Sequence, residues 1–210
     1  MKQLGQELLK IFNEKKEHIG TASRDAVHKQ GLWHEVFHCW FISKDEEEPY
    51  IYLQLRSEEK KEYPNLYDIT AAGHLLADET VEDGVREIEE EIGLTIPFNE
   101  LTPLGTTDYI VENNDLIDKE ISHLFMYGYD GDMDELKLQP GEVSGMIKAP
   151  FEDFYKLWFG KIDKVLIKGY HLDDAGTKLS IEKTVGKESF VPHPLSFYQE
   201  VVKRIKNNLG

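Results

Sequence analysis

The stretch VREIEEEIGL (85–94) holds three glutamates that one cation could bind together. Glu87 and Glu91 are four residues apart on a predicted helix, and Glu90 lies within the same arc of about 100°. Like charges at this spacing repel by a few tenths of a kcal/mol, so a bound cation would relieve them. Mg²⁺ prefers oxygen ligands, usually one or two carboxylates with waters and substrate phosphates. The spacing predicts a site for Mg²⁺ (or Mn²⁺) beside a phosphate group, with a solvated acidic helix face as the alternative.

A helix over residues 80–92 would carry these glutamates. Thr80 and Asp83 are spaced as in a capping box, and Gly93 follows the last helical residue, where a left-handed glycine commonly ends a helix. One apolar stripe, which would face the core, consists of Val81, Val85, Ile88 and Ile92. Gly84 interrupts the helix, and either leaves room for a ligand beside the glutamates or is tolerated at the surface.

The segment GHLLADETVEDGVREIEEEIGL (73–94) resembles the Nudix box. The second half of that motif is matched at every specified position by Arg86, Glu87, Ile88, Glu90, Glu91, Gly93 and Leu94. The first half departs from the motif, because six residues rather than seven separate Glu79 from Arg86. Either Asp78 or Glu79 therefore fills the first acidic position.

The resemblance implies an α/β (α+β) fold with a Nudix-type mixed β-sheet sandwiched between helices. It also implies a metal-dependent hydrolase that cleaves a diphosphate linkage in a nucleoside diphosphate derivative or a related small molecule. Position by position, it assigns the metal to Glu87, Glu90 and Glu91, and catalysis to Glu87, Glu90 and Arg86. Glu142, in QPGEVSGM, resembles the later glutamate that serves some members as the general base. Gly73 and Arg56 are candidates for substrate binding.

Over residues 8–200 the chain is also similar to the branch that contains isopentenyl-diphosphate isomerase. By that resemblance His28, His34, His74 and Glu120 form a second metal site, with ligands that suit Zn²⁺ or Mn²⁺ better than Mg²⁺. Hydrogen-bonded histidines at the rim of a sheet are the alternative.

The isomerases transfer a proton with a cysteine directly before the Gly-His of this turn, where the present sequence has Ala71-Ala72-Gly73-His74. Cys39, the only cysteine, lies in a different segment and is expected to be a buried, inert thiol. We therefore expect hydrolysis rather than isomerisation. An isomerase with another acid and a non-catalytic nucleotide-binding module remain as alternatives.

The chain has 210 residues and a formal charge of −16, from 40 acidic and 24 basic side chains. Such a field repels nucleic acids and anionic membranes, so a small-molecule diphosphate is the expected partner. One cysteine and the lack of a long apolar segment favour a cytoplasmic protein. A homodimer remains open.

The elements that must position these residues are strands and flanking helices within one domain, residues 1–210. The core spans about 33–160, with an N-terminal extension over 1–32 and a C-terminal extension over 161–210. Ser23 and Gly31 bound a short helix in the first extension. The second contains a hairpin that turns at Gly176, with Lys168 as a further substrate-binding candidate. The predicted strands are 35–42, 49–57, 66–76, 123–130 and 142–150, and a closing helix spans 194–208.

Overall fold

A computed structural model describes residues 7–43, 48–113 and 116–209 of the chain. In these residues one continuous sheet contains β1 (Leu8–Phe12), β2 (His18–Ser23), β3 (Trp33–Ile42), β4 (Tyr50–Arg56), β5 (Tyr67–Asp68), β6 (Ala71–His74), β7 (Thr102–Asn113), β8 (Leu116–Gly128), β9 (Val143–Pro150), β10 (Val165–Leu172) and β11 (Lys178–Val185). The helices are α1 (Arg24–Gln30), α2 (Arg86–Ile92), α3 (Phe151–Trp158) and α4 (Leu195–Leu209).

Strand β3 lies at the centre of this sheet. Along one edge it pairs with β8 in parallel, and along the other it pairs in turn with β1, β6 and β4, all antiparallel. The path through the sheet runs β11-β10-β9-β4-β3-β1-β2, and the remaining strands pair beside it. The mixed sheet confirms the predicted fold class.

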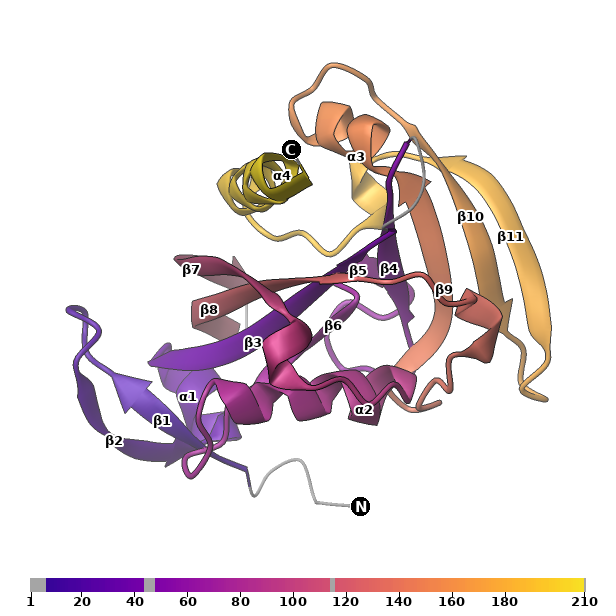
Figure 1. Cartoon of the computed structure of the whole chain (residues 1–210). Coiled ribbons are helices and arrows are strands. Elements are labelled where there is room, and N and C mark those ends of the chain that lie inside the picture. Colours follow the sequence, from indigo (N-terminus) through magenta and orange to yellow (C-terminus); the bar gives the residue numbers. More distant parts are fainter. Residues whose placement is uncertain (1–6, 44–47, 114–115, 210) are drawn as a thin grey trace.

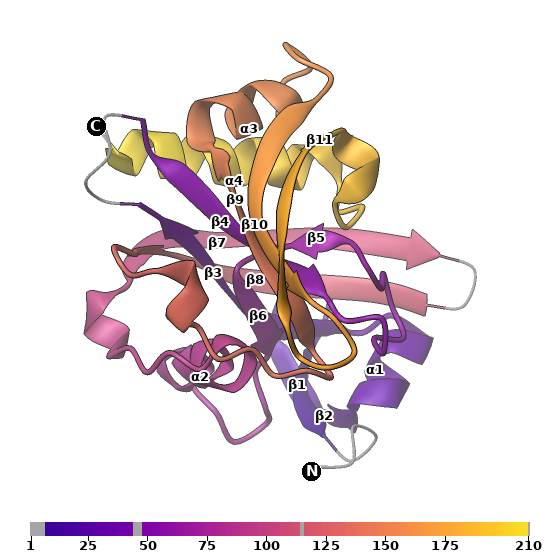
Figure 2. The ribbon, with the colours of Figure 1, turned by 90° about the vertical axis from the view of Figure 1, so that its right-hand side faces the viewer.

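The two faces of the sheet build two hydrophobic cores. On β3, Phe37 and Cys39 pack towards α2, whereas Trp40 and Ile42 pack in the core that includes side chains of α3 and α4. This alternation follows from the period of two along a strand. Figures 1 and 2 show α3 and α4 on one side of the sheet and α2 on the other. The core that contains Phe37 and Cys39 also contains Ile88 and Ile92, so α2 packs over β3 and β6.

The predicted helix over 80–92 is shorter than expected. A 3-10 turn, Glu82–Val85, precedes α2, which begins at Arg86. Gly84 in this turn is buried, and a Cβ there would lie 2.7 Å from the ring of Phe37. Both interpretations of Gly84 are therefore wrong: it permits close packing onto β3 and neither makes room for a ligand nor lies at the surface.

The other helix signals are confirmed. Ile88 and Ile92 are fully buried, as the apolar stripe predicts, and Gly93 ends α2 with φ 71°. The side chain of Ser23 caps α1, and Gly31 ends it in the left-handed conformation. Because each signal involves only residues close in sequence, local patterning was enough to predict it.

The strand predictions succeed for the central strands and fail at three places. Residues 66–76 form two short strands, because β5 pairs with β4 whereas β6 pairs with β3. The β1–β2 hairpin and β7 were not predicted. The acidic turn between β3 and β4 lies largely outside the described residues. The C-terminal hairpin of β10 and β11 is present, with Gly176 at φ 76°, and α4 follows it.

Among the described residues, the helices are all too short or too polar to span a membrane.

Candidate functional site

Glu87 lies directly against the backbone of β6. A Cβ on Gly73 would overlap its carboxylate carbon, so only glycine leaves space for this side chain. Burial is the main cause that raises the pKa of Glu87 to about 7, and the charges of Glu90 and Glu79 act in the same direction. Gly73, predicted to bind substrate, here makes room for a candidate metal ligand.

Glu91 is the most deeply buried of the three glutamates, with 7% exposure. The backbone N–H of Ala72 donates to its Oε2 at 3.0 Å, and the Gln54 side chain donates to the same atom at 3.2 Å. Burial and the nearby charge of Glu87 raise its pKa to about 8. Two neighbouring carboxyl groups are therefore buried with raised pKa values, and a bound cation would stabilise their ionised forms.

Arg86 organises the surrounding carboxylates. Its guanidinium donates to Glu79 at 2.5 and 2.9 Å, to Glu87 at 2.6 Å and to the exposed Glu90 at 3.2 Å. A fifth hydrogen bond reaches the backbone oxygen of His74 at 3.1 Å. Glu79 pairs with Arg86 and also accepts from Leu76 N–H, contacts that favour Glu79 over Asp78 for the first acidic position.

Glu142 forms an ion pair with Lys60 just before β9. The Gln139 N–H donates to the Glu91 backbone oxygen at 3.0 Å and the Glu142 N–H donates to the Gln139 oxygen at 2.9 Å, so this loop is joined to α2 at Glu91. The backbone N–H of Ser57 donates to the Glu142 backbone oxygen at 2.9 Å and joins the two loops. Glu142 therefore lies near the predicted metal ligands, and Lys60 is a neighbour that the sequence did not single out.

The two other substrate-binding candidates have partners within the protein. Arg56 pairs with Asp68 at 2.9 Å and donates to the backbone oxygens of Glu62 and Tyr63. Lys168, half exposed on β10, forms an ion pair with Glu182 of β11 at 3.1 Å. A role for either residue in substrate binding stays a prediction.

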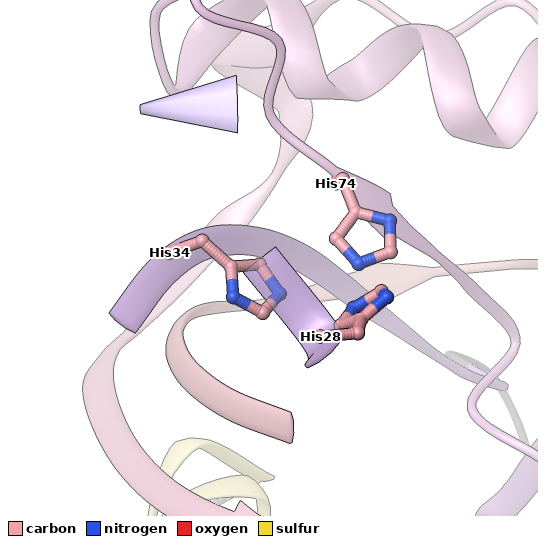
Figure 3. Close-up of side chains that lie close together, drawn as sticks. All are labelled: His28, His34 and His74. Carbon is pink, nitrogen blue, oxygen red and sulfur yellow. The ribbon is translucent and has the colours of Figure 1, made fainter. Parts of the chain in front are cut away.

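The histidine cluster, His28, His34 and His74, brings together side chains from α1, β3 and β6. Figure 3 shows the three imidazoles gathered around one point. Their ring centroids are 5.0 to 5.2 Å apart, and one nitrogen of each ring lies within 4.8 Å of the others. Because the backbone oxygen of Leu32 can only accept, the His34 Nδ1 at 3.1 Å must be the donor, which leaves Nε2 as the ligand atom.

Asp118 supplies a carboxylate oxygen to the same point. Its Oδ1 lies 3.4 Å from His34 Nε2 and 3.7 Å from His28 Nε2, and these three buried atoms lack hydrogen-bond partners. Burial lowers the pKa of each histidine, to about 4 for His28, so the rings are neutral at pH 7. Burial and the charge of Glu120 raise the pKa of Asp118. Neutral imidazoles and an unpaired carboxyl oxygen are a suitable ligand set for a transition metal.

Glu120, the acid predicted for this cluster, lies on the same face of β8 as Asp118, two residues further along the strand. Its Oε2 accepts from the Tyr109 hydroxyl at 2.5 Å and lies 3.5 Å from His38 Nε2. Burial by itself raises the pKa of Glu120, but hydrogen bonds from His38 and Tyr109 outweigh it and leave the pKa well below its usual range. Asp118 was missed, although its spacing of two from Glu120 on one strand signals a shared face.

The carboxylates and the histidine cluster lie on opposite faces of β6. Gly73 and His74 are successive strand residues, so they point to opposite sides of the sheet. Gly73 faces Glu87, whereas His74 joins His28 and His34. Only one strand therefore separates the two candidate metal sites.

The chain matches known proteins over most of its length. The family model for the NUDIX domain matches residues 32–168. A Nudix hydrolase of Clostridium acetobutylicum, named as uncharacterized, is 32% identical over 203 residues, which cover 97% of this chain and 98% of that protein. Isopentenyl-diphosphate Delta-isomerase 2 of Photorhabdus laumondii is 25% identical over 166 residues, 74% of this chain and 90% of that protein.

Solved structures share the fold. The crystal structure of the MutT protein from Methanosarcina mazei Go1 superposes with a TM-score of 0.54 at 17% identity, and covers 84% of this chain and 95% of that one.

Proposed function

The chain belongs to the Nudix hydrolase family, whose members act on nucleoside diphosphate derivatives, and we propose that it is a metal-dependent hydrolase of a diphosphate linkage in such a compound or a related small molecule. The observation that carries the metal dependence is the pair of buried carboxyl groups over β6. Glu87 and Glu91 have raised pKa values, of about 7 and about 8, because burial and neighbouring negative charges disfavour their ionised forms. A divalent cation would reverse both effects.

The side chains present fit Mg²⁺ or Mn²⁺. Glu87 and Glu91 offer oxygen ligands from within the protein, and the exposed Glu90 offers a third from the solvent side. A bound ion would neutralise phosphate oxygens and lower the pKa of a coordinated water. Arg86 keeps the carboxylates of Glu87 and Glu90 in place, so its role is to organise the ligands.

Glu142 is the candidate general base in this proposal. Its carboxylate pairs with Lys60, and its loop is joined to the Glu91 backbone oxygen by the N–H of Gln139 at 3.0 Å. A general base must lie within hydrogen-bond distance of the attacking water in the substrate complex. If Lys60 pairs with a substrate phosphate instead of Glu142, the Glu142 carboxylate becomes free to accept a proton from the attacking water.

The histidine cluster with Asp118 is proposed as a second metal site. The observation that supports it is the set of three buried, unpartnered atoms that converge there, His28 Nε2, His34 Nε2 and Asp118 Oδ1. Unpaired buried polar atoms are costly, so a cluster of them calls for a ligand. Imidazole nitrogens favour Zn²⁺ or Mn²⁺ at this position.

Isomerisation of a prenyl diphosphate is the second candidate, because of the similarity to the Photorhabdus laumondii isomerase. The residue at the position of the isomerase cysteine is Ala72, which cannot transfer a proton. Cys39 is fully buried, and burial raises the pKa of its thiol far above neutral pH. Hydrolysis requires neither thiol and is therefore the reaction we propose.

We place the protein in the cytoplasm, since its only cysteine is a free, buried thiol.

The test is a substrate panel with Mg²⁺ or Mn²⁺. The panel holds nucleoside diphosphate derivatives, dinucleoside polyphosphates and prenyl diphosphates, and the readout is the release of phosphorus-containing products. We expect Glu91→Gln to abolish release and Glu89→Gln, an exposed position on the same helix, to leave it unchanged. Full activity of Glu91→Gln would exclude the metal role of Glu91. Binding without turnover on the whole panel would indicate a binding module. Deuterium uptake into isopentenyl diphosphate would indicate an isomerase.

A further inference from the structure

The C-terminal segment contributes a largely enclosed histidine, His193, although the NUDIX match ends at residue 168. The His193 side chain is 10% exposed, and its Nε2 lies 3.1 Å from Oδ1 of Asp68, which is 7% exposed. The second Asp68 oxygen binds Arg56 at 2.9 Å. A histidine that simply decorates a surface hairpin would not be enclosed in this way.

The backbone around His193 is fixed by hydrogen bonds and prolines. Val191 N–H donates to the Tyr67 backbone oxygen at 2.9 Å, next to Asp68 on β5, and the Tyr198 hydroxyl donates to the Val191 oxygen at 2.7 Å. Pro192 and Pro194 flank the histidine and restrict its backbone. The segment is therefore docked on β5 before α4 begins.

A chain of hydrogen bonds connects Asp68 to Glu120 through His193. The Tyr109 hydroxyl donates to Glu120 Oε2 at 2.5 Å, so its oxygen is left to accept. His193 Nδ1, at 3.1 Å, is the donor to that oxygen, and Nε2 is the donor to Asp68. The imidazole of His193 therefore bridges the Tyr109 hydroxyl and the carboxylate of Asp68.

Glu120 in turn lies beside the histidine cluster. In the parallel pairing of β3 with β8 it is directly opposite His34, and its charge acts on the pKa values of all three histidines. Tyr109 and Ser122 both donate to Oε2, which determines the direction of the other carboxylate oxygen. Phe197 of α4 packs against Tyr109 with ring centroids 4.5 Å apart, which holds the phenol in place.

We propose that His193 is a positioning residue of the second metal site: held by Asp68, it fixes Tyr109 and thereby orients the carboxylate of Glu120 towards the histidine cluster. This inference rests on the proposed second metal site. It assigns a role to the C-terminal segment, which completes the metal site from outside the matched family domain. Partners of this kind orient metal ligands, and their loss typically weakens metal binding by about 10- to 100-fold.

The test is a Co²⁺ titration of the full chain, followed by the visible absorption of the bound ion. His34→Asn identifies the band that belongs to the histidine cluster. In His193→Gln the amide nitrogen can replace Nε2 against Asp68 but leaves Tyr109 without its donor, so we expect at least about tenfold weaker Co²⁺ binding and an altered band. Tyr109→Phe should give the same loss, and the double variant should be no weaker than either single one, because both changes break one chain.

The matched control is His123→Gln, a histidine of β8 that pairs with Glu35 at 2.9 Å and points to the opposite face of the sheet. It should leave the Co²⁺ affinity unchanged. Wild-type affinity in folded His193→Gln, or losses that multiply in the double variant, would overturn the proposal. If His193→Gln does not fold, unchanged affinity in Tyr109→Phe overturns it. The absence of any band sensitive to His34→Asn would overturn the second metal site as well, but not diphosphate hydrolysis, which the substrate panel tests separately.

Discussion

Glu91 is the position where stability and metal binding are most directly opposed. Its carboxyl group is buried against β6 and has a pKa of about 8, raised first by burial and then by Glu87. Glutamine has the same shape and keeps an oxygen for the hydrogen bonds from Gln54 and Ala72. We therefore expect Glu91→Gln to stabilise the metal-free protein while it removes metal binding.

The size of this effect follows from the difference between the folded and unfolded pKa values. The ordinary pKa is 4.5, so the stability contributed by the neutral carboxyl is fully present below about pH 4.5 and is lost as the pH rises towards 8. At pH 7 the loss covers about 2.5 pH units, or about 3 kcal/mol at 1.36 kcal/mol per unit. At pH 5 the same calculation gives a loss of less than about 1 kcal/mol. For a chain of this length, 3 kcal/mol corresponds to a Tm shift of about 6 to 12 °C.

The assay is urea unfolding of the wild type, Glu91→Gln and the exposed control Glu89→Gln in the presence of a chelator at pH 5 and pH 7. We expect the free energy of unfolding of Glu91→Gln to be higher than that of the wild type at pH 7 and nearly the same at pH 5. Added Mg²⁺ should then stabilise the wild type and the control, but not Glu91→Gln.

Two results would refute this reasoning. Equal stability of the wild type and Glu91→Gln at pH 7 would show that ionisation of Glu91 has no cost in the fold. A gain of equal size at both pH values would assign the effect to packing rather than to charge.

Three further predictions concern the same region. Mg²⁺ binding should release protons near pH 7, because it requires the ionised forms of Glu87 and Glu91, and calorimetry in buffers of different ionisation enthalpy measures the number released. Gly73→Ala should displace Glu87 and lower Mg²⁺-dependent activity by about 100-fold, whereas Gly84→Ala should mainly lower the free energy of unfolding, by about 1–3 kcal/mol. Steady-state kinetics should show a loss of about tenfold or more for Glu79→Gln and none for Asp78→Asn, since of these two acids Glu79 is the one that pairs with Arg86; the reverse order would contradict this assignment.

The sequence alone determined what depends on neighbours along the chain. The spacing of Ile88 and Ile92 predicted the buried face of α2, and Gly93 predicted its end. The helical period also predicted that Glu87, Glu90 and Glu91 lie within one arc. The motif around Arg86 was enough to predict the family, and the histidines at positions 28, 34 and 74 were named before their geometry was known. The helix inferences rest on the fixed period of a helix and the family on a motif of fixed spacing, whereas the histidines followed from the resemblance to the isomerase branch.

Only the tertiary structure decided what depends on contacts between distant segments. The choice between Asp78 and Glu79 required the position of the Arg86 side chain, and the role of Gly84 required its distance to Phe37. Asp118 joined the histidine cluster only once β8 was paired with β3, and His193 met Asp68 across 125 residues of sequence. Short-range periodicity does not predict such pairings, because the partners and register of a strand depend on how the whole sheet buries its apolar side chains.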